Sequence, residues 1–202
     1  MITRFLLTTV ILATLPSCAV VKTWRETIRK GELARREQAK AAAAPAAPKL
    51  FEWEGDNVPG TPTVKISLGE QKARIYKDGQ PVGWTYVATG VSAHRTPTGS
   101  FRIMEKVADK RSNRWGIVVN SSGNTVDGEA RSGREAIPSG GRFVGASMPH
   151  WMRLTGYGIG MHGGPIPRPG QPASHGCIRL PFEMAGVMFR NLPSGTPVQI
   201  TE

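Results

Sequence analysis

The sequence contains few cysteines, no long apolar segment and no internal repeat. Two cysteines in 202 residues exclude a disulfide-dense secreted scaffold. An uncharged run near the N-terminus, residues 5–15, is too short to cross a bilayer as a helix, which needs about 20 apolar residues. A hydrophobic fraction of 39% with 20% charged residues is typical of a globular protein. The length therefore suits one domain with additional segments.

Acidic residues are scarce relative to basic ones, with 15 Asp and Glu against 26 Lys and Arg, so the formal net charge is +11. Such an excess suggests a polyanionic partner, nucleic acid first of all. More than half of the excess lies in residues 1–50, which carry nine basic and three acidic side chains. The remainder contains no motif that reads nucleic acid, and the export signal described next conflicts with that role. We therefore expect no nucleic-acid partner.

The N-terminus has the features of an export signal. Arg4 precedes the uncharged run, which has the length of a signal-peptide core. The following Leu15-Pro16-Ser17-Cys18 resembles a bacterial lipobox, which implies cleavage after residue 17 and lipidation of Cys18. Ala19 after the cysteine, by the same resemblance, favours the outer membrane. The alternative is an ordinary secretory signal in which Cys18 is incidental. We expect a membrane-anchored lipoprotein that faces the periplasm or the cell wall.

Residues 18–49 read as a tether between the expected anchor and a folded domain. A short charged helix is expected first, and the sequence AAAAPAAP then forms a low-complexity spacer. The basic residues of this segment either attract anionic lipid head groups or belong to a solvated stalk.

Residues 50–202 have the pattern of many short strands. They hold 23 of the 24 glycines and 13 of the 16 prolines. Residues 64–68 and 82–88 alternate apolar and polar side chains, and Asp78-Gly79 between them predicts a hairpin turn. One amphipathic helix is expected over 182–191. The pattern predicts a mainly β, predominantly antiparallel sandwich or barrel-like fold whose active residues lie on loops. Further short strands are expected at 101–103, 117–119, 143–144, 152–154, 159–161, 178–180 and 198–200.

Two glycine-rich segments concentrate the chemistry, Met161 to Gly164 (MHGG) and Ser174 to Leu180 (SHGCIRL). Cys177 is the only cysteine left in the expected domain. A cysteine thiol is mostly protonated at neutral pH, so nucleophilic catalysis needs a neighbouring imidazole or dipole. We predict that two adjacent strand ends bring the imidazole of His162 against the Cys177 sulfur.

The pairing of His162-Gly163 with the Ser-His-Gly-Cys-Ile-Arg element resembles the signature of the L,D-transpeptidase (YkuD-like) catalytic domain. The resemblance extends to Thr89-Gly90, to the TPTGSF sequence of residues 96–101 and to GTPV at 195–198, so it covers residues 62–201. It implies the fold of that family and an enzyme that acts on peptidoglycan stem peptides.

The resemblance also implies roles for individual residues. Cys177 would attack the carbonyl before the terminal D-alanine of a stem tetrapeptide and form a thioester, with His162 transferring the protons. Backbone N–H groups around Gly176 and Cys177 are candidates for an oxyanion hole.

Other residues of the same segments are expected to assist. The supporting group is His175 and Ser174, and the substrate-binding group is Arg179 and Gly163. An acceptor stem would give a 3→3 cross-link, a protein lysine would give covalent attachment, and water would give carboxypeptidase activity. The residues do not decide among these three acceptors.

Two alternatives from other classes stay open. One is a zinc site made from Cys177 and histidines of residues 150–175, although the chain lacks paired CxxC or HExxH motifs. The other is a non-catalytic lipoprotein that binds peptidoglycan through its basic surface. We expect a monomer without metal or cofactor.

Several further residues are assigned mainly from the residues that flank them in the sequence. His94 and His150 have no catalytic motif around them and are expected to be structural or on the surface. The basic, glycine-rich residues 107–147 are either a lid that binds acidic stems or solvated loops. The tryptophans expected in the core are Trp84, Trp115 and Trp151.

Overall fold

A computed structural model describes residues 18–42 and 48–202 of the chain. The expected signal peptide (1–17) and most of the Ala-Pro spacer (43–47) lie outside the described residues. The chain divides into two compact units between Pro48 and Lys49.

The first unit contains the helix α1 (Cys18–Ala42), which is 25 residues long. It is longer than the short helix expected, because Ala, Glu, Gln, Lys and Arg, all strong helix formers, fill most of its second half. Side chains of residues 23–39 are exposed to solvent throughout. Among residues 18–42 and 48–202, no helix combines the length and apolar character required to cross a membrane.

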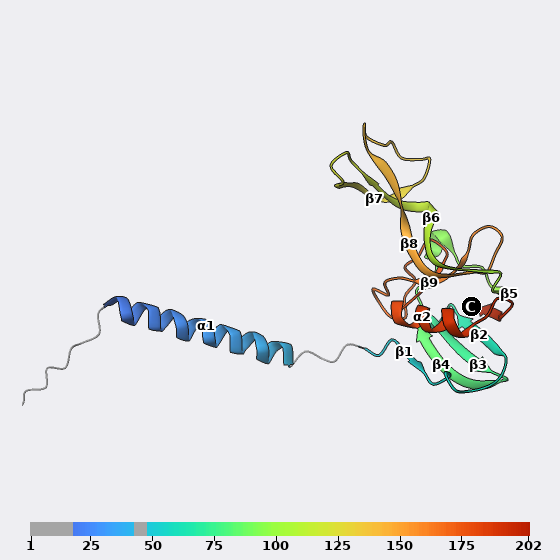
Figure 1. The fold of residues 1–202 in the computed structure, drawn as a ribbon, viewed down its shortest axis with the longest axis horizontal. Coiled ribbons are helices and arrows are strands. Elements are labelled where there is room, and N and C mark those ends of the chain that lie inside the picture. The colour runs from blue at the N-terminus through green and yellow to red at the C-terminus, as the bar shows by residue number, and fades with distance from the viewer. Residues whose placement is uncertain (1–17, 43–47) are drawn as a thin grey trace, which may run out of the picture. The chain divides into compact units, whose positions relative to one another are not determined.

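The second unit contains two sheets and is mainly β, as predicted (Figure 1). The first sheet has the spatial order β1 (Phe51–Trp53), β4 (Gln80–Tyr86), β3 (Lys72–Lys77), β2 (Pro62–Ser67), β11 (Pro197–Thr201) and β5 (Gly99–Arg102). The second has the order β10 (Ile178–Leu180), β9 (Gly160–Gly163), β8 (Arg142–Arg153), β6 (Glu105–Val119) and β7 (Thr125–Arg131). Neither sheet closes into a barrel.

Most neighbouring strands are antiparallel, and two pairs, β9 with β10 and β2 with β11, are parallel. The predicted hairpin joins β3 to β4, where Asp78 and Gly79 both have positive φ values of 46° and 84°. This is the backbone that an Asp-Gly pair favours in a two-residue hairpin.

The hydrophobic core lies between the inner face of the first sheet, the second sheet and the helix α2 (Phe182–Asn191). The helix occupies the predicted residues. Its Met184 and Met188 are fully buried, as are Ile66 and Ile75 of the first sheet. Met161, Ile178 and Leu180 of β9 and β10 belong to the same cluster, so the core fixes the two strands that carry the glycine-rich motifs.

Residues 107–147, expected to be either a lid or solvated loops, consist mostly of strands. They form the long strands β6 and β8 with β7 along the edge, and in Figure 1 these strands extend away from the first sheet. The short strands expected at 143–144 and 152–154 are parts of the single strand β8, which pairs with β6 along most of its length. We call residues 105–153 the arm.

Candidate active site

The parallel pair β9 and β10 brings the two glycine-rich motifs together. In its register His162 faces Arg179 and Met161 faces Ile178. Cys177 immediately precedes β10, and side chains two residues apart on a strand share a face. His162, Cys177 and Arg179 all line one cavity of about 280 Å³. The two residues predicted to meet therefore line a common cavity.

The ring of His162 is buried, with 6% of the residue exposed, and its Nδ1 lies 2.9 Å from the carbonyl oxygen of Gly163. A carbonyl oxygen accepts hydrogen bonds, so Nδ1 carries the proton and the lone pair is left on Nε2. Burial lowers the pKa of His162 to about 4; the Gly163 carbonyl opposes this shift and the charge of Arg179 adds to it. The imidazole is therefore neutral at neutral pH and can accept a proton.

The thiol of Cys177 is partly buried, and its Sγ lies 3.7 Å from the carbonyl oxygen of Gly158. Burial raises the pKa of this thiol, while the Gly160 N–H and the charges of Arg179 and Arg114 oppose the shift. No hydrogen bond joins Sγ to the His162 ring within residues 48–202. At neutral pH both groups are therefore uncharged, a thiol and a neutral imidazole.

A tight turn presents Cys177. The Ser174 hydroxyl donates to the Cys177 carbonyl oxygen and accepts the Gly176 N–H at 3.1 Å. Gly176 has φ +115°, a conformation that side-chain-bearing residues rarely adopt. Because the Gly176 N–H is engaged inside the turn, the Cys177 N–H is the better candidate for an oxyanion donor.

The TPTG segment (residues 96–99) supports this turn through hydrogen bonds. Thr96 Oγ1 donates to the Gly176 carbonyl oxygen at 2.7 Å and accepts the Gly90 N–H at 2.9 Å. A Cβ on Gly90 would lie 1.9 Å from the His94 carbonyl oxygen and 2.9 Å from the Gly176 Cα. This contact between Gly90 and the turn therefore requires glycine.

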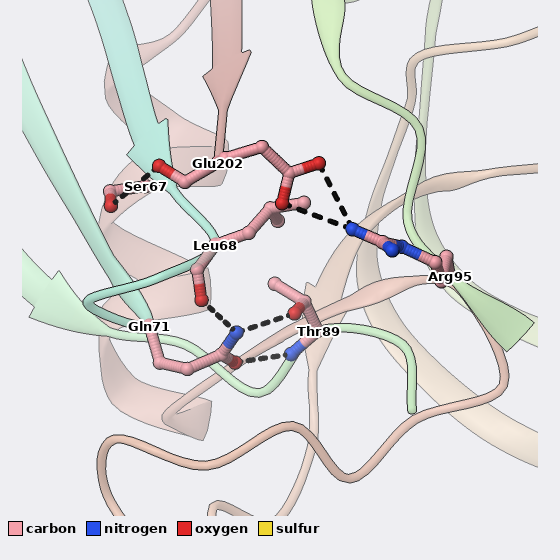
Figure 2. Close-up of polar contacts among 6 residues, drawn as sticks. All are labelled: Ser67, Leu68, Gln71, Thr89, Arg95 and Glu202. Atoms are coloured by element: carbon pink, nitrogen blue, oxygen red, sulfur yellow. Dashed lines mark hydrogen bonds and ion pairs between the residues drawn. The ribbon is translucent and has the colours of Figure 1, made fainter. Parts of the chain in front are cut away.

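A buried glutamine connects the segment that supports the turn to the first sheet through hydrogen bonds (Figure 2). Gln71, which is 3% exposed, donates from Nε2 to Thr89 Oγ1 and to the Leu68 carbonyl, each at 2.7 Å, and accepts the Thr89 N–H at 2.9 Å. The Thr89 carbonyl in turn accepts the N–H groups of Ala173 and Ser174 at 2.9 and 3.0 Å. No motif pointed to Gln71, since its role depends on contacts 18 residues apart.

Trp115 and His94 are part of the site environment, contrary to expectation. The indole of Trp115 stacks on the His175 ring, with centroids 4.0 Å apart and planes at 13°. The His94 ring lies 5.2 Å from both. Glu129 of β7 lies 3.7 Å from His175 Nε2, and burial nevertheless lowers the pKa of His175 overall. The arm therefore contacts His175, two residues before Cys177.

The position of Trp115 results from an irregularity in β6. The pairing of β6 with β8 shifts register between Arg111 and Gly116. Ser112 stabilises the irregular stretch, since its Oγ accepts the N–H groups of Arg114 and Trp115 at 3.2 and 3.0 Å. Bulges of this kind redirect side chains beside active sites.

The other residues expected in the core or on the surface have different outcomes. Trp151 is buried, with 1% exposure, as predicted, whereas Trp84 on β4 is only partly buried and its Nε1 donates to Glu52. His150 is structural, as expected: its ring lies 5.4 Å from that of Phe189.

Arg179 and Gly163 differ in their access to the cavity. Arg179 lines it, and burial lowers its pKa. Gly163 is buried behind His162 and supplies the carbonyl that orients the ring, while the neighbouring Gly164 lines the cavity. Within the part of the chain that the structure describes, no group of three or more His, Cys, Asp or Glu residues is placed to hold a metal ion.

Comparisons with known proteins identify the family of the second unit. A profile of the YkuD family, described as the L,D-transpeptidase catalytic domain, matches residues 61–200. The Bacillus subtilis (strain 168) protein YqjB, a candidate L,D-transpeptidase, is 29% identical over 150 residues, which are 73% of this chain and 76% of YqjB.

Solved L,D-transpeptidases share the fold. The enzyme from Mycobacterium smegmatis has a TM-score of 0.54 at 19% identity, covering 70% of this chain and 59% of its own. LdtMt1 in complex with imipenem gives 0.52 at 22%, with 70% and 59% covered. A cysteine mutant of the Enterococcus faecium enzyme gives 0.50 at 23%, with 71% and 50% covered. This chain thus spans less than two thirds of the length of these proteins. The profile covers well over half of the present sequence, and the chain therefore belongs to the YkuD family of L,D-transpeptidase catalytic domains.

Proposed function

We propose that the chain is a cysteine-dependent peptidoglycan L,D-transpeptidase that forms a thioester with a stem tetrapeptide and transfers it to an acceptor amine. The observation that carries the proposal is the cavity lined by both Cys177 and His162, in which the imidazole is neutral and oriented by the Gly163 carbonyl. Membership of the family supports the substrate class.

Acylation begins with a proton transfer inside the cavity. Nε2 of His162 takes the thiol proton as Sγ of Cys177 attacks the carbonyl carbon before the terminal D-alanine. The tetrahedral intermediate collapses when the C–N bond breaks and His162 returns the proton to the departing amine. The products are D-alanine and a thioester on Cys177.

Deacylation reverses these roles with a new nucleophile. His162 removes a proton from the acceptor amine, the amine attacks the thioester, and the C–S bond breaks to regenerate the thiol. A stem-peptide amine yields a 3→3 cross-link, a protein lysine yields protein attachment, and water yields carboxypeptidase activity.

Two further groups stabilise charge in this scheme. The Cys177 N–H is the preferred oxyanion donor, because a trans peptide directs it opposite to the Gly176 carbonyl that Thr96 holds. Arg179 lines the cavity and is placed to pair with a substrate carboxylate. His175 supports the site through its stack on Trp115, and Ser174 shapes the turn.

The N-terminal sequence supports a site of action at an envelope membrane. We propose that Cys18 is lipidated after removal of residues 1–17 and that α1 and the spacer connect this anchor to the catalytic unit. Peptidoglycan, the substrate of the family, lies outside the cytoplasm, which is consistent with export.

The function is tested by incubating wild type and Cys177→Ala with tetrapeptide muropeptides and analysing the products by mass spectrometry. Wild type is expected to release D-alanine and form new linkages, and the variant neither. Equal D-alanine yields from the two proteins would refute the assignment of Cys177. The same product spectrum distinguishes cross-links, protein attachment and hydrolysis.

A carbapenem provides an independent probe of the thiol. Imipenem is bound in the solved LdtMt1 complex, so this class of compound is suited to testing the present chain. We expect a covalent adduct on Cys177 and little reaction with most other β-lactams. Absence of a carbapenem adduct by peptide mapping would count against an accessible, activated cysteine.

A further inference from the structure

A second hollow, of about 410 Å³, lies against Cys177 on the side of the arm. Four basic side chains line it: Lys110, Arg114, Arg131 and Arg153. No aspartate or glutamate belongs to its lining among the described residues. We call it the basic hollow.

Most of these cations lack a carboxylate partner. Arg153 is paired with Glu105 at 2.7 Å. Lys110, Arg114 and Arg131 make no ion pair within residues 48–202. The ammonium of Lys110 lies 6.0 Å from the Trp151 ring centre, and the guanidinium of Arg131 lies 5.7 Å from that of Trp115. Aromatic rings contact these two cations, and no carboxylate among the described residues forms an ion pair with either.

The cavity lined by His162 is less basic and more apolar than the basic hollow. Arg179 is the one Lys or Arg among its described lining residues, and Met148, Pro165 and Trp115 give it an apolar wall. Cys177 lines both spaces, so a substrate extended across the nucleophile would meet several positive charges on only one side.

We propose that the basic hollow makes this chain selective for stem peptides whose glutamate and diamino-acid carboxylates are free, over stems in which these groups are amidated. The inference rests on the proposed function, because it concerns the substrate of the same cysteine. A carboxamide has nearly the shape of a carboxylate but no charge, so discrimination must come from electrostatics. Partly exposed pairs contribute up to about fivefold each, and two or three together give roughly tenfold selectivity.

The test compares two synthetic tetrapeptides that differ only in amidation of these carboxylates. The rate of D-alanine release, as kcat/KM, is measured for the full-length wild type, for the double variant Arg114→Gln with Arg131→Gln, and for Arg142→Gln. Arg142 is an exposed residue of β8 that does not line the hollow, so its replacement removes a similar charge from the same arm. The ratio of the two substrates cancels any effect of Arg114 on the reactivity of Cys177.

Wild type and Arg142→Gln are expected to prefer the carboxylate stem by about tenfold at low salt, and the double variant by about twofold or less. The preference of wild type should also shrink between 0.05 and 0.5 M NaCl, because salt screens partly exposed charges. Equal rates of wild type on both stems would overturn the inference and leave the proposed function intact. A preference retained in the double variant would also overturn it.

Equilibrium binding of the two stems to full-length Cys177→Ala separates this inference from the chemistry. Tighter binding of the carboxylate stem, lost when Arg114 and Arg131 are also replaced, would support the selectivity. Equal binding of the two stems would contradict it. Absence of D-alanine release from either stem by wild type would overturn the proposed function, while the binding comparison would still decide the role of the basic hollow.

Discussion

His162 shows how burial and one hydrogen bond set the protonation state of a residue. Its Nδ1 proton is committed to the Gly163 carbonyl, and its burial disfavours the charged imidazolium. A histidine in this state accepts a proton from a nearby thiol without first having to lose one. The same burial makes the residue a source of pH-dependent stability.

Acid should destabilise the fold through His162. Its pKa is lowered from 6.5 to about 4 in the folded protein, so the unfolded chain binds this proton first as the pH falls. Stability present above pH 6.5 is therefore lost progressively between pH 6.5 and 4, up to about 3 kcal/mol. Urea unfolding at several pH values should show this loss in wild type. His162→Gln should lack this component, and an identical pH dependence in the two proteins would contradict the expected burial.

The catalytic rate should also depend on the protonation of His162. Since His162 remains neutral well below pH 6.5, kcat/KM for D-alanine release should vary little between pH 5 and 7 and fall only near pH 4. Initial rates measured across this range, with folding monitored by circular dichroism, provide the check. An acidic limb centred near pH 6.5 would mean that a solvated imidazole controls the reaction.

Different elements around the site position different residues. The pairing of β9 with β10 brings His162 near Cys177. The loop after β4 and the TPTG segment hold the turn that presents Cys177. The irregular stretch of β6 places Trp115 against His175 on the open side. Cys177 is thus held by segments that lie far apart in the sequence.

Thr96 is expected to act as a positioning residue. In Thr96→Val the carbonyl of Gly176 and the N–H of Gly90 lose their partner, which costs about 1–3 kcal/mol of stability. We expect kcat for D-alanine release to fall by about tenfold, since the Cys177 N–H is no longer held in place. Thr96→Ser keeps the hydroxyl and should restore most of kcat. An unchanged kcat in folded Thr96→Val would show that the contact serves stability alone.

Local patterns predicted the elements that depend on neighbouring residues. The Asp-Gly hairpin, the alternating strands and the helix after Pro181 follow from turn chemistry and periodicity, and each lies where expected. The motifs likewise predicted that the segments around His162 and Cys177 adjoin, and β9 pairs with β10. Only short pieces of the arm, such as 117–119 and 143–144, were predicted as strands. The rest could not be predicted in this way, because its polar, glycine-rich strands carry little periodicity and are stabilised by pairing with each other. The contacts of Gln71, His94 and Trp115 also depend on distant segments, so no short pattern in the sequence marks them.

At the scale of the whole molecule, the chain combines a YkuD catalytic unit with a charged helical segment. The net charge of +11 does not indicate one continuous basic surface, since a large share belongs to residues 1–50. Within the catalytic unit, four basic side chains gather in the hollow beside Cys177. Four positive charges therefore lie close to Cys177.

The proposed anchor makes a prediction for the intact protein in a bacterial host. Cys18→Ser should remove lipidation and leave an unprocessed or soluble form, because no cysteine remains at the expected acylation site. Membrane fractionation with intact-mass measurement compares it with wild type, and Cys177→Ser serves as a control that keeps the anchor. Unchanged membrane association and mass of Cys18→Ser would remove this proposal.

The central claim is that Cys177 carries the acyl group, and trapping this intermediate tests it most directly. The full-length protein is mixed with a stem tetrapeptide lacking an acceptor amine, quenched in acid at short times and examined by intact-mass spectrometry and peptide mapping. We predict an adduct equal to the tetrapeptide minus D-alanine, located on Cys177 and absent from Cys177→Ala. D-alanine release without any adduct on Cys177, at the same rate in Cys177→Ala, would contradict the account.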